Sequence, residues 1–183
     1  MRMFLTPHPQ SRSLAVDQIE VEIERSRSDQ LTLSFTLTGN ISRIALPHVS
    51  APIRRAELWK RSCFEAFLRS VKNSQYYEFN FSPSTEWAAY KFDEYRTKMR
   101  EAPEIDAPQI NWWSVGNSYT LQVRLKIGSM TGMVRATWQI GLSAVIEERS
   151  GSKSYWSLVH PTENPDFHHP ASFVYELMPQ EQK

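Results

Sequence analysis

Trp59 and Glu65 are the residues whose types and spacing most clearly suggest chemistry. They lie six positions apart, with the tryptophan at the start of an extended segment and the carboxylate inside it. A flat indole ring can pack on the C–H face of a sugar ring, and a fixed carboxylate accepts hydrogen bonds from hydroxyl groups. A second interpretation needs no ligand: Trp59 is a core ring at a sheet edge, and Glu65 pairs with Arg54, Arg55 or Arg96.

A second group of candidate residues lies near the C-terminal end, where three imidazoles and one carboxylate occur within ten residues: His160, Asp166, His168 and His169. Histidine and aspartate are ligands for zinc and other transition metals. Their spacing matches no established ligand motif, and two prolines in the same stretch restrict its backbone. The alternative is a structural loop that closes one end of the fold, in which the carboxylate orients the histidines.

Glu65 and Glu78 are the carboxylate pair to consider for catalysis, as in glycoside hydrolysis. They belong to different extended segments, so the sequence does not give their separation. No glycine-rich phosphate loop, nucleophile elbow or ordered Ser, His and Asp triad occurs in the sequence. The lone cysteine, Cys63, falls in an extended segment that we expect to be buried. We therefore favour a protein without catalytic activity.

The segment from residue 57 to residue 96 positions these carboxylates and contains the densest group of aromatic rings in the chain. Side chains of a strand alternate between its two faces, so Cys63, Glu65 and Phe67 should share one face. In the next extended segment one face carries Tyr77, Phe79 and Phe81, and the other carries Tyr76, Glu78, Asn80 and Ser82. A Pro-Ser turn then leads into a third extended segment, residues 86–92. The pattern predicts three neighbouring antiparallel strands.

Alternating apolar residues predict further strands on both sides of this block. They cover residues 18–24, 31–38, 109–115, 118–126, 138–146, 155–158 and 172–177, with a short segment at 41–46, one or two helical turns within 93–101 and a flexible link at 128–133. Turn signals recur roughly every 8 to 12 residues, which is typical of an antiparallel sandwich. The predicted fold class is all-β: a single-domain antiparallel β-sandwich, jelly-roll-like and of immunoglobulin size or larger. We expect it to cover residues 14–178, with loose ends at 1–13 and 179–183.

Composition and charge argue against several classes of partner. The chain has 21 basic and 20 acidic side chains, so its formal net charge of +1 creates no field that would attract nucleic acid or anionic lipid. One cysteine cannot form an internal disulfide, and the first 13 residues contain no apolar run as long as a signal peptide or membrane span. We expect a cytoplasmic protein that binds neither nucleic acid nor membrane.

Several stretches of the sequence resemble the bacterial DOMON-like proteins. They are WxxxCFExFL from Trp59, YEFNxSPxxEW from Tyr77, YWxLxHP from Tyr155 and PDFH from Pro165. DOMON-like proteins are similar to family 9 carbohydrate-binding modules and, more remotely, to haem-binding DOMON domains. The resemblance covers about residues 14 to 178 and implies a β-sandwich. That sandwich hosts sugar binding, haem binding and members of unknown role.

The resemblance also implies roles for particular residues. In the sugar-binding modules, a tryptophan and an acidic residue at this spacing help to form the ligand slot, which assigns that role to Trp59 and Glu65. A second ring should face the first, and the candidates are Trp87, Trp112, Trp113 and Trp156. Trp156, in the matched stretch from Tyr155, is the favoured one. Distant haem-binding relatives use a Met and a His as axial ligands. The candidates here are Met99, Met130 and Met133 with His168 or His48.

We therefore expect a non-catalytic ligand-binding module for a carbohydrate or carbohydrate-like molecule held by aromatic side chains. The expected ligand-binding residues are Trp59, Glu65, Trp87, Arg96 and Trp156. A haem- or metal-binding protein is the alternative, and an interaction domain that uses a sheet face is a third. The loop from His160 to Pro170 should pack against the sandwich, because its prolines restrict its backbone and Phe167 supplies an apolar anchor.

Overall fold

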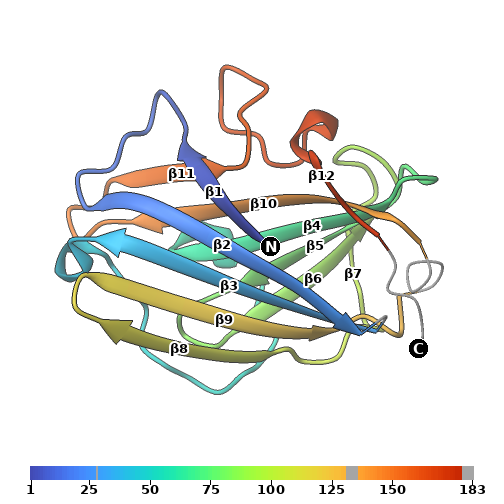
Figure 1. Cartoon of the computed structure of the whole chain (residues 1–183), viewed down its shortest axis with the longest axis horizontal. Helices are drawn as coiled ribbons and strands as arrows, with labels where there is room; N and C mark the ends of the chain where they lie inside the picture. The colour runs from blue at the N-terminus through green and yellow to red at the C-terminus, as the bar shows by residue number, and fades with distance from the viewer. Residues whose placement is uncertain (28, 131–135, 179–183) are drawn as a thin grey trace.

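The computed structural model describes residues 1–27, 29–130 and 136–178, which form twelve antiparallel strands and three short 3-10 helices (Figure 1). The strands are β1 (Arg2–Pro7), β2 (Val16–Arg27), β3 (Gln30–Gly39), β4 (Cys63–Ser70), β5 (Tyr76–Phe81), β6 (Trp87–Phe92), β7 (Arg100–Glu101), β8 (Gln109–Val115), β9 (Ser118–Lys126), β10 (Trp138–Glu147), β11 (Lys153–Ser157) and β12 (Tyr175–Leu177). The 3-10 helices are η1 (Ile41–Arg43), η2 (Leu58–Lys60) and η3 (Pro170–Ser172). The predicted all-β class is confirmed.

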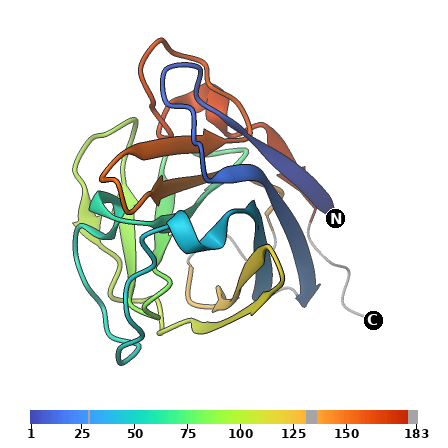
Figure 2. The same ribbon diagram turned by 90° about the vertical axis from the view of Figure 1, so that its left-hand side faces the viewer.

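The strands form one sheet that folds over into two packed layers. Its order is β7-β6-β5-β4-β10-β11-β1-β2-β3-β9-β8, and β12 pairs with the first three residues of β10. Figure 1 shows β2, β3, β9 and β8 in front of β10, β4, β5 and β6, and Figure 2 shows the same layers after a 90° turn. β4, β5 and β6 are consecutive antiparallel neighbours, as the sequence pattern predicts.

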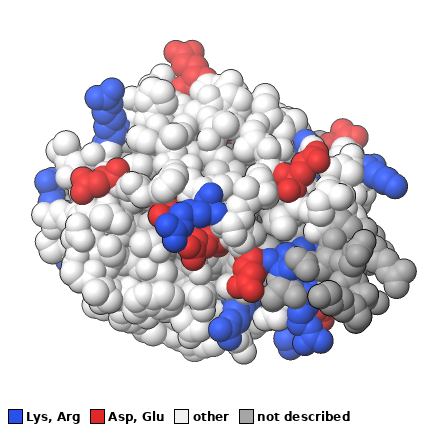
Figure 3. Space-filling model, viewed as in Figure 1, with Lys and Arg blue, Asp and Glu red and all other residues white. Residues whose placement is uncertain are grey.

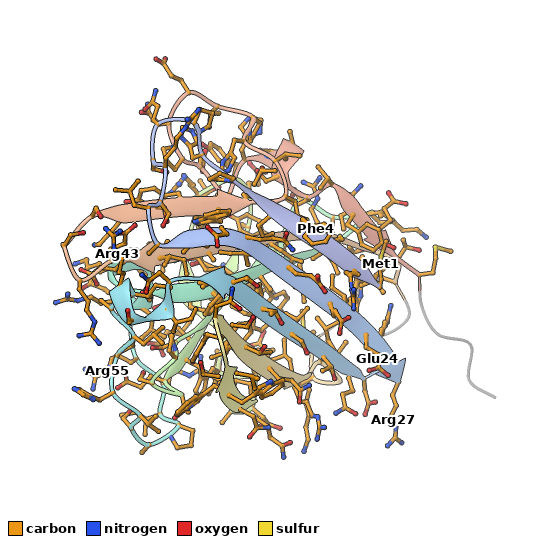
Figure 4. The ribbon with its side chains drawn as sticks, turned by 60° about the vertical axis from the view of Figure 1, so that its left-hand side comes forward. Met1, Phe4, Glu24, Arg27, Arg43 and Arg55 are labelled. Carbon is orange, nitrogen blue, oxygen red and sulfur yellow. The ribbon has the colours of Figure 1, made fainter. Side chains whose placement is uncertain are left out.

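β1 is the strand that joins the two layers, and it corrects the expectation that residues 1–13 are loose. Its first residues pair with β2, and its last two pair with β11. Figure 4 shows Phe4 on this strand and Met1 just before it, beside β2 with Glu24 and Arg27 at its C-terminal end. The segment that follows is also anchored, because the buried Glu148 carboxylate accepts hydrogen bonds from Ser13 Oγ and Leu14 N, both at 2.9 Å. Backbone pairing and this one carboxylate therefore hold a stretch that has little apolar periodicity.

The main core lies between the layers and follows the predicted alternation. On β3 the inward residues Leu31, Leu33, Phe35 and Leu37 are fully buried, and the residues between them are partly exposed. On β5 the rings of Tyr77, Phe79 and Phe81 stack in a row, with centroids 6.2 and 6.3 Å apart. Burial of one such side chain stabilises the fold by about 1.5–3 kcal/mol, so this face contributes strongly to stability.

The outer face of β4, β5 and β6 is also buried, although it points away from the main core. A second apolar cluster covers it, formed by Leu58, Cys63, Phe67, Tyr76, Ala88, Tyr90, Phe92 and Phe173, with Trp59 and Phe167 packed against it. Phe167 and Phe173 come from the long segment between β11 and β12, drawn in red at the top of Figure 1. Loops therefore form a third layer over this part of the sheet.

Two local expectations differ from the structure, and a third falls partly outside the described residues. Residues 41–46 form η1 and a single bridge between Ile44 and Glu148, not a strand, because Asn40 and Gly39 already turn the chain. Residues 93–101 contain no helix but a tight turn with an isolated bridge, followed by β7. Part of the expected link at 128–133 lies outside the described residues.

Charged side chains are dispersed over the surface. On the face shown in Figure 3, isolated Lys and Arg side chains alternate with Asp and Glu, with no continuous area of one sign. In the part of the chain that the structure describes, no helix is long and apolar enough to cross a membrane.

Candidate functional site

A cavity of about 450 Å³ opens on the outer face of β4, β5 and β6. The sheet forms its floor, the segment between β11 and β12 and the turn after β6 form its sides, and η2 lies at its edge. Three of the five expected ligand-binding residues line it: Trp59, Glu65 and Arg96. The loops of the third layer and the polar residues of the sheet therefore line the same cavity.

Two buried carboxyl groups, Glu65 and Glu78, form the polar part of the floor. Both side chains leave the sheet on the same face, since Glu65 is paired with Asn80, two residues along β5 from Glu78. Diagonal neighbours of this kind on adjacent strands have Cα atoms about 7–8 Å apart. Each accepts one short bond: Ser143 Oγ donates to Glu65 Oε2, and Asn80 Nδ2 donates to Glu78 Oε1, both at 2.8 Å.

These surroundings make both carboxyl groups hard to ionise. Glu65 is 3% exposed and Glu78 is 4% exposed. Burial raises the pKa of Glu65 well above its ordinary value, and the neighbouring Glu78 raises it further, while the Ser143 bond and the Arg96 charge act in the opposite direction. Burial also raises the pKa of Glu78, opposed by the Asn80 bond and again by Arg96. The floor therefore keeps protons that exposed glutamates would lose.

His168 sits beside Glu78 as a neutral imidazole. The Arg96 backbone N–H donates to the Tyr76 hydroxyl, so that hydroxyl can donate its own proton to His168 Nδ1, 2.9 Å away. The proton of the ring is then on Nε2, which lies 3.7 Å from Glu78 Oε2. Burial and the Arg96 charge lower the pKa of His168 to about 4, although Asp166 partly opposes them.

Arg96 connects the turn after β6 to the segment between β11 and β12. Its Nη2 donates to Asp166 Oδ1 at 2.8 Å, and the Tyr95 hydroxyl donates to the other oxygen of the same carboxylate. The backbone of Arg96 is left-handed, with φ of 54°, which is uncommon for a residue with a side chain. The hydrogen bonds of Tyr95 and Arg96 to Asp166 thus hold a strained turn that directs the guanidinium to the cavity.

Aromatic rings supply the apolar part of the lining. Trp59 is half-buried and meets the Tyr90 ring edge to face, with centroids 5.9 Å apart. Tyr155 and Phe167 are tilted against each other at 6.4 Å and line the cavity from the other segments. A sugar or another flat, polar molecule could pack on these rings while the floor supplies hydrogen bonds.

The other two expected ligand-binding residues lie elsewhere. Trp87 is 4% exposed and belongs to the main core, with the Arg54 guanidinium 4.2 Å from its ring centroid. Trp156 also faces the main core, where its Nε1 donates to Ser154 Oγ at 2.9 Å. Because neighbours on a strand point to opposite faces, Tyr155 reaches the cavity while Trp156 does not.

The three arginines considered as partners of Glu65 are engaged by other groups. Arg54 donates to backbone carbonyls of Ala89, Ala102 and Ile105, Arg55 forms an ion pair with Glu86, and Arg96 forms one with Asp166. Of these, only Arg96 acts electrostatically on Glu65. Its charge reaches the carboxyl group without an ion pair being formed between them.

The four candidate metal ligands do not gather around one point. His160 Nε2 binds the Thr6 carbonyl, His169 Nδ1 accepts from Ala171 N, Asp166 binds Arg96 and Tyr95, and His168 faces Glu78. Within residues 1–27, 29–130 and 136–178, no group of three His, Cys, Asp or Glu side chains could hold a metal ion. The loop instead packs on the sandwich through Phe167 and the partly buried His168, as its composition predicts.

Met99 and His168, one of the candidate pairs of axial haem ligands, both line the cavity. The ring does not fit that role. Its Nδ1 is bonded to the Tyr76 hydroxyl and its Nε2 is directed at Glu78, so neither nitrogen presents a free lone pair to the cavity. Met130 is buried in the main core, and Met133 lies outside the described residues.

Several lining residues were not among the expected ligand-binding residues: Lys60, Glu78, Lys153, Tyr155 and Phe167. One signal for Glu78 was in the sequence, because it lies in the polar row of β5 between Tyr76 and Asn80. Lys60 is adjacent to Trp59, and Tyr155 is adjacent to Trp156. Nothing in the spacing showed that β11 and its loop fold over the outer face.

Comparison with known proteins supports the fold. The chain matches no protein-family model and no curated protein sequence. Among solved structures it is similar to a candidate carbohydrate-binding protein from Bacteroides uniformis, with a TM-score of 0.70 and 13% identity over 94% of this chain and 83% of that one. It is also similar to a family 9 carbohydrate-binding module from Caldicellulosiruptor kristjanssonii in complex with glucose, with a TM-score of 0.54 and 8% identity over 94% and 81% of the two chains. At these identities the likeness establishes the architecture: the chain has the β-sandwich fold found in carbohydrate-binding modules.

Proposed function

We propose that this protein binds a small carbohydrate in the cavity above β4, β5 and β6 and leaves it chemically unchanged. The observation that carries the proposal is the combination in one cavity of the half-buried Trp59 ring with the buried carboxyl groups of Glu65 and Glu78. Sugar rings present both an apolar face and a rim of hydroxyl groups, so they need both kinds of partner. The volume, about 450 Å³, is in the range of pockets that bind small molecules.

The floor supports a binding role because its polar groups are fixed before any ligand arrives. Ser143 holds Glu65 through one oxygen, and Asn80 holds Glu78 through one oxygen. In each carboxyl group the second oxygen remains for a ligand or a neighbour. Such fixed groups reduce the loss of side-chain entropy on binding, which increases affinity.

Structural likeness adds support from outside the chain. One of the similar sandwiches is a family 9 module in complex with glucose, and another is a candidate carbohydrate-binding protein. The sequence resemblance to the DOMON-like proteins, which are similar to the same modules, points in the same direction. A monosaccharide or a disaccharide is the class of ligand that we propose.

A ligand screen by thermal unfolding tests this proposal. A ligand that binds only the folded protein raises its stability by about 2.7 kcal/mol when present at a hundred times its Kd. We expect one or more of glucose, galactose, mannose and cellobiose to raise the melting temperature in a saturable way. Glycerol at the same concentration is the control for nonspecific stabilisation. Shifts no larger than that of glycerol across the panel would contradict the proposal.

A further inference from the structure

Charges of opposite sign are separated by depth in the cavity. The carboxyl groups of Glu65 and Glu78 lie on its floor, whereas Lys60, Arg96 and Lys153 line its more exposed parts. The side chains of Lys60 and Arg96 are 61% and 51% exposed. A molecule that enters the cavity therefore meets three cations before it reaches the floor.

The two lysines are held close together by the fold. Lys153 Nζ donates to the backbone carbonyl of Lys60 at 2.6 Å, which brings its ammonium group to the residue next to Trp59. Of the two ammonium groups, that of Lys60 is paired with Glu57, in an exposed contact of 2.8 Å between residues three apart. Exposed pairs of this kind contribute about 0–1 kcal/mol, so a ligand can readily replace Glu57.

The carboxyl groups cancel only part of this positive charge. Burial favours the protonated, neutral form of both groups, and the neighbouring Glu78 further disfavours ionisation of Glu65. Asp166 does neutralise part of the charge of Arg96. Lys153 forms no ion pair with any residue that the structure describes, and its remaining two N–H groups are available.

We propose that the carbohydrate bound in this cavity is acidic, with a carboxylate or phosphate group held by Lys60 and Lys153 and by the free N–H groups of Arg96. The sugar ring then packs on Trp59 while its hydroxyl groups reach the floor. This inference rests on the proposed function and adds the charge of the ligand to it. Lysine and arginine suit both anions, because both are recognised by charge-assisted hydrogen bonds.

Three ligands that share one ring separate charge from shape. They are glucose, glucuronate and glucose 6-phosphate, titrated calorimetrically into the same protein at low and at physiological ionic strength. We expect at least one of the two anions to bind about tenfold more tightly than glucose, which is about 1.4 kcal/mol. The advantage should decrease with added salt, because partly exposed charges are screened. The anion with the larger advantage identifies the group as carboxylate or phosphate.

A pair of double variants assigns the effect to the lysines. Lys60→Gln with Lys153→Gln should remove most of the advantage that the favoured anion has over glucose. Lys72→Gln with Lys126→Gln removes the same charge from exposed positions outside the cavity and should preserve the advantage. Thermal unfolding of both variants shows that each is folded before titration.

Each outcome decides between the two proposals. Glucose binding as tight as that of both anions would overturn the inference about charge and leave the carbohydrate site standing. An advantage that survives in the cavity variant but falls in the control variant would also overturn it. No binding of any of the three sugars would contradict the proposed function itself.

Discussion

Asp166 and Arg96 form a 2.8 Å ion pair that ties the segment after β11 to the turn after β6, and Arg96 lines the cavity. Asp166 is the more buried partner, at 13% side-chain exposure against 51% for Arg96. The two segments are separated by 70 positions in the sequence. This pair makes the shape of the cavity dependent on a long-range contact, so its removal should affect binding as well as stability.

Asp166→Asn should therefore lower the free energy of unfolding by about 1 kcal/mol and weaken sugar binding. Bonds from Tyr95 and Arg96 lower the pKa of Asp166 despite its partial burial. A lowered pKa contributes stability above the unfolded pKa, near 3.9, and this stability is lost as pH falls through the folded pKa. Urea unfolding at pH 7 and pH 3 should show a larger difference between wild type and variant at the higher pH. Asp106→Asn, at an exposed position, is the control, and equal losses in the two variants would contradict the role of the pair.

Glu65→Gln and Glu78→Gln should have the opposite dependence on pH. The unfolded chain loses these protons near pH 4.3, whereas the folded protein keeps them to higher pH, so the wild type loses stability as pH rises between the two values. Glutamine stays neutral and still accepts the bond from Ser143 or Asn80. Each variant should be close to the wild type at pH 4 and more stable by about 1–3 kcal/mol at pH 8. Chemical unfolding at the two pH values measures this difference. Glu24→Gln, exposed on β2, should show none, and a Glu65 or Glu78 variant less stable than wild type at pH 8 would contradict the raised pKa values.

The Tyr76 and Tyr119 hydroxyls offer a matched comparison of a bonded and an unbonded group. Tyr76 OH accepts from Arg96 N and bonds His168 Nδ1, whereas Tyr119 OH is buried without a hydrogen-bond partner among the described residues. Tyr76→Phe leaves Arg96 N and the histidine ring without a partner and should lower the free energy of unfolding by about 1–3 kcal/mol. Tyr119→Phe removes an unsatisfied group and should be neutral or stabilising. Equal destabilisation by both substitutions would show that the Tyr76 bonds contribute little.

The residues that form the main core could be predicted because their positions follow from the alternation of side chains along each strand. Strand alternation predicted which residues of β3, β5 and β9 face the core. The stacked row of Tyr77, Phe79 and Phe81 lies on one face, as predicted. β1 could not be predicted in this way, because it is held by backbone pairing to two other strands and only Leu5 is buried on it.

The site was only half predictable for a related reason. Every residue of β5 is buried, so alternation could not tell which face would meet a loop and which would meet the other layer. Tyr155 and Trp156 are neighbours on β11 and point to opposite faces, so the expected lining ring was displaced by one residue. Arg96 reaches the cavity through a left-handed turn, and its partner Asp166 comes from a loop whose path no local pattern determines.

Calorimetric titration of the best sugar from the thermal screen into wild type, Trp59→Ala and Trp113→Ala tests the central claim most directly. Trp59 lines the cavity and is half-buried, while Trp113 is 44% exposed on β8 and lies outside it. If the ring is a platform for the ligand, Trp59→Ala should weaken binding by about 1–3 kcal/mol and remain folded, while Trp113→Ala binds as the wild type does. Unchanged sugar affinity in a folded Trp59→Ala variant would contradict the account.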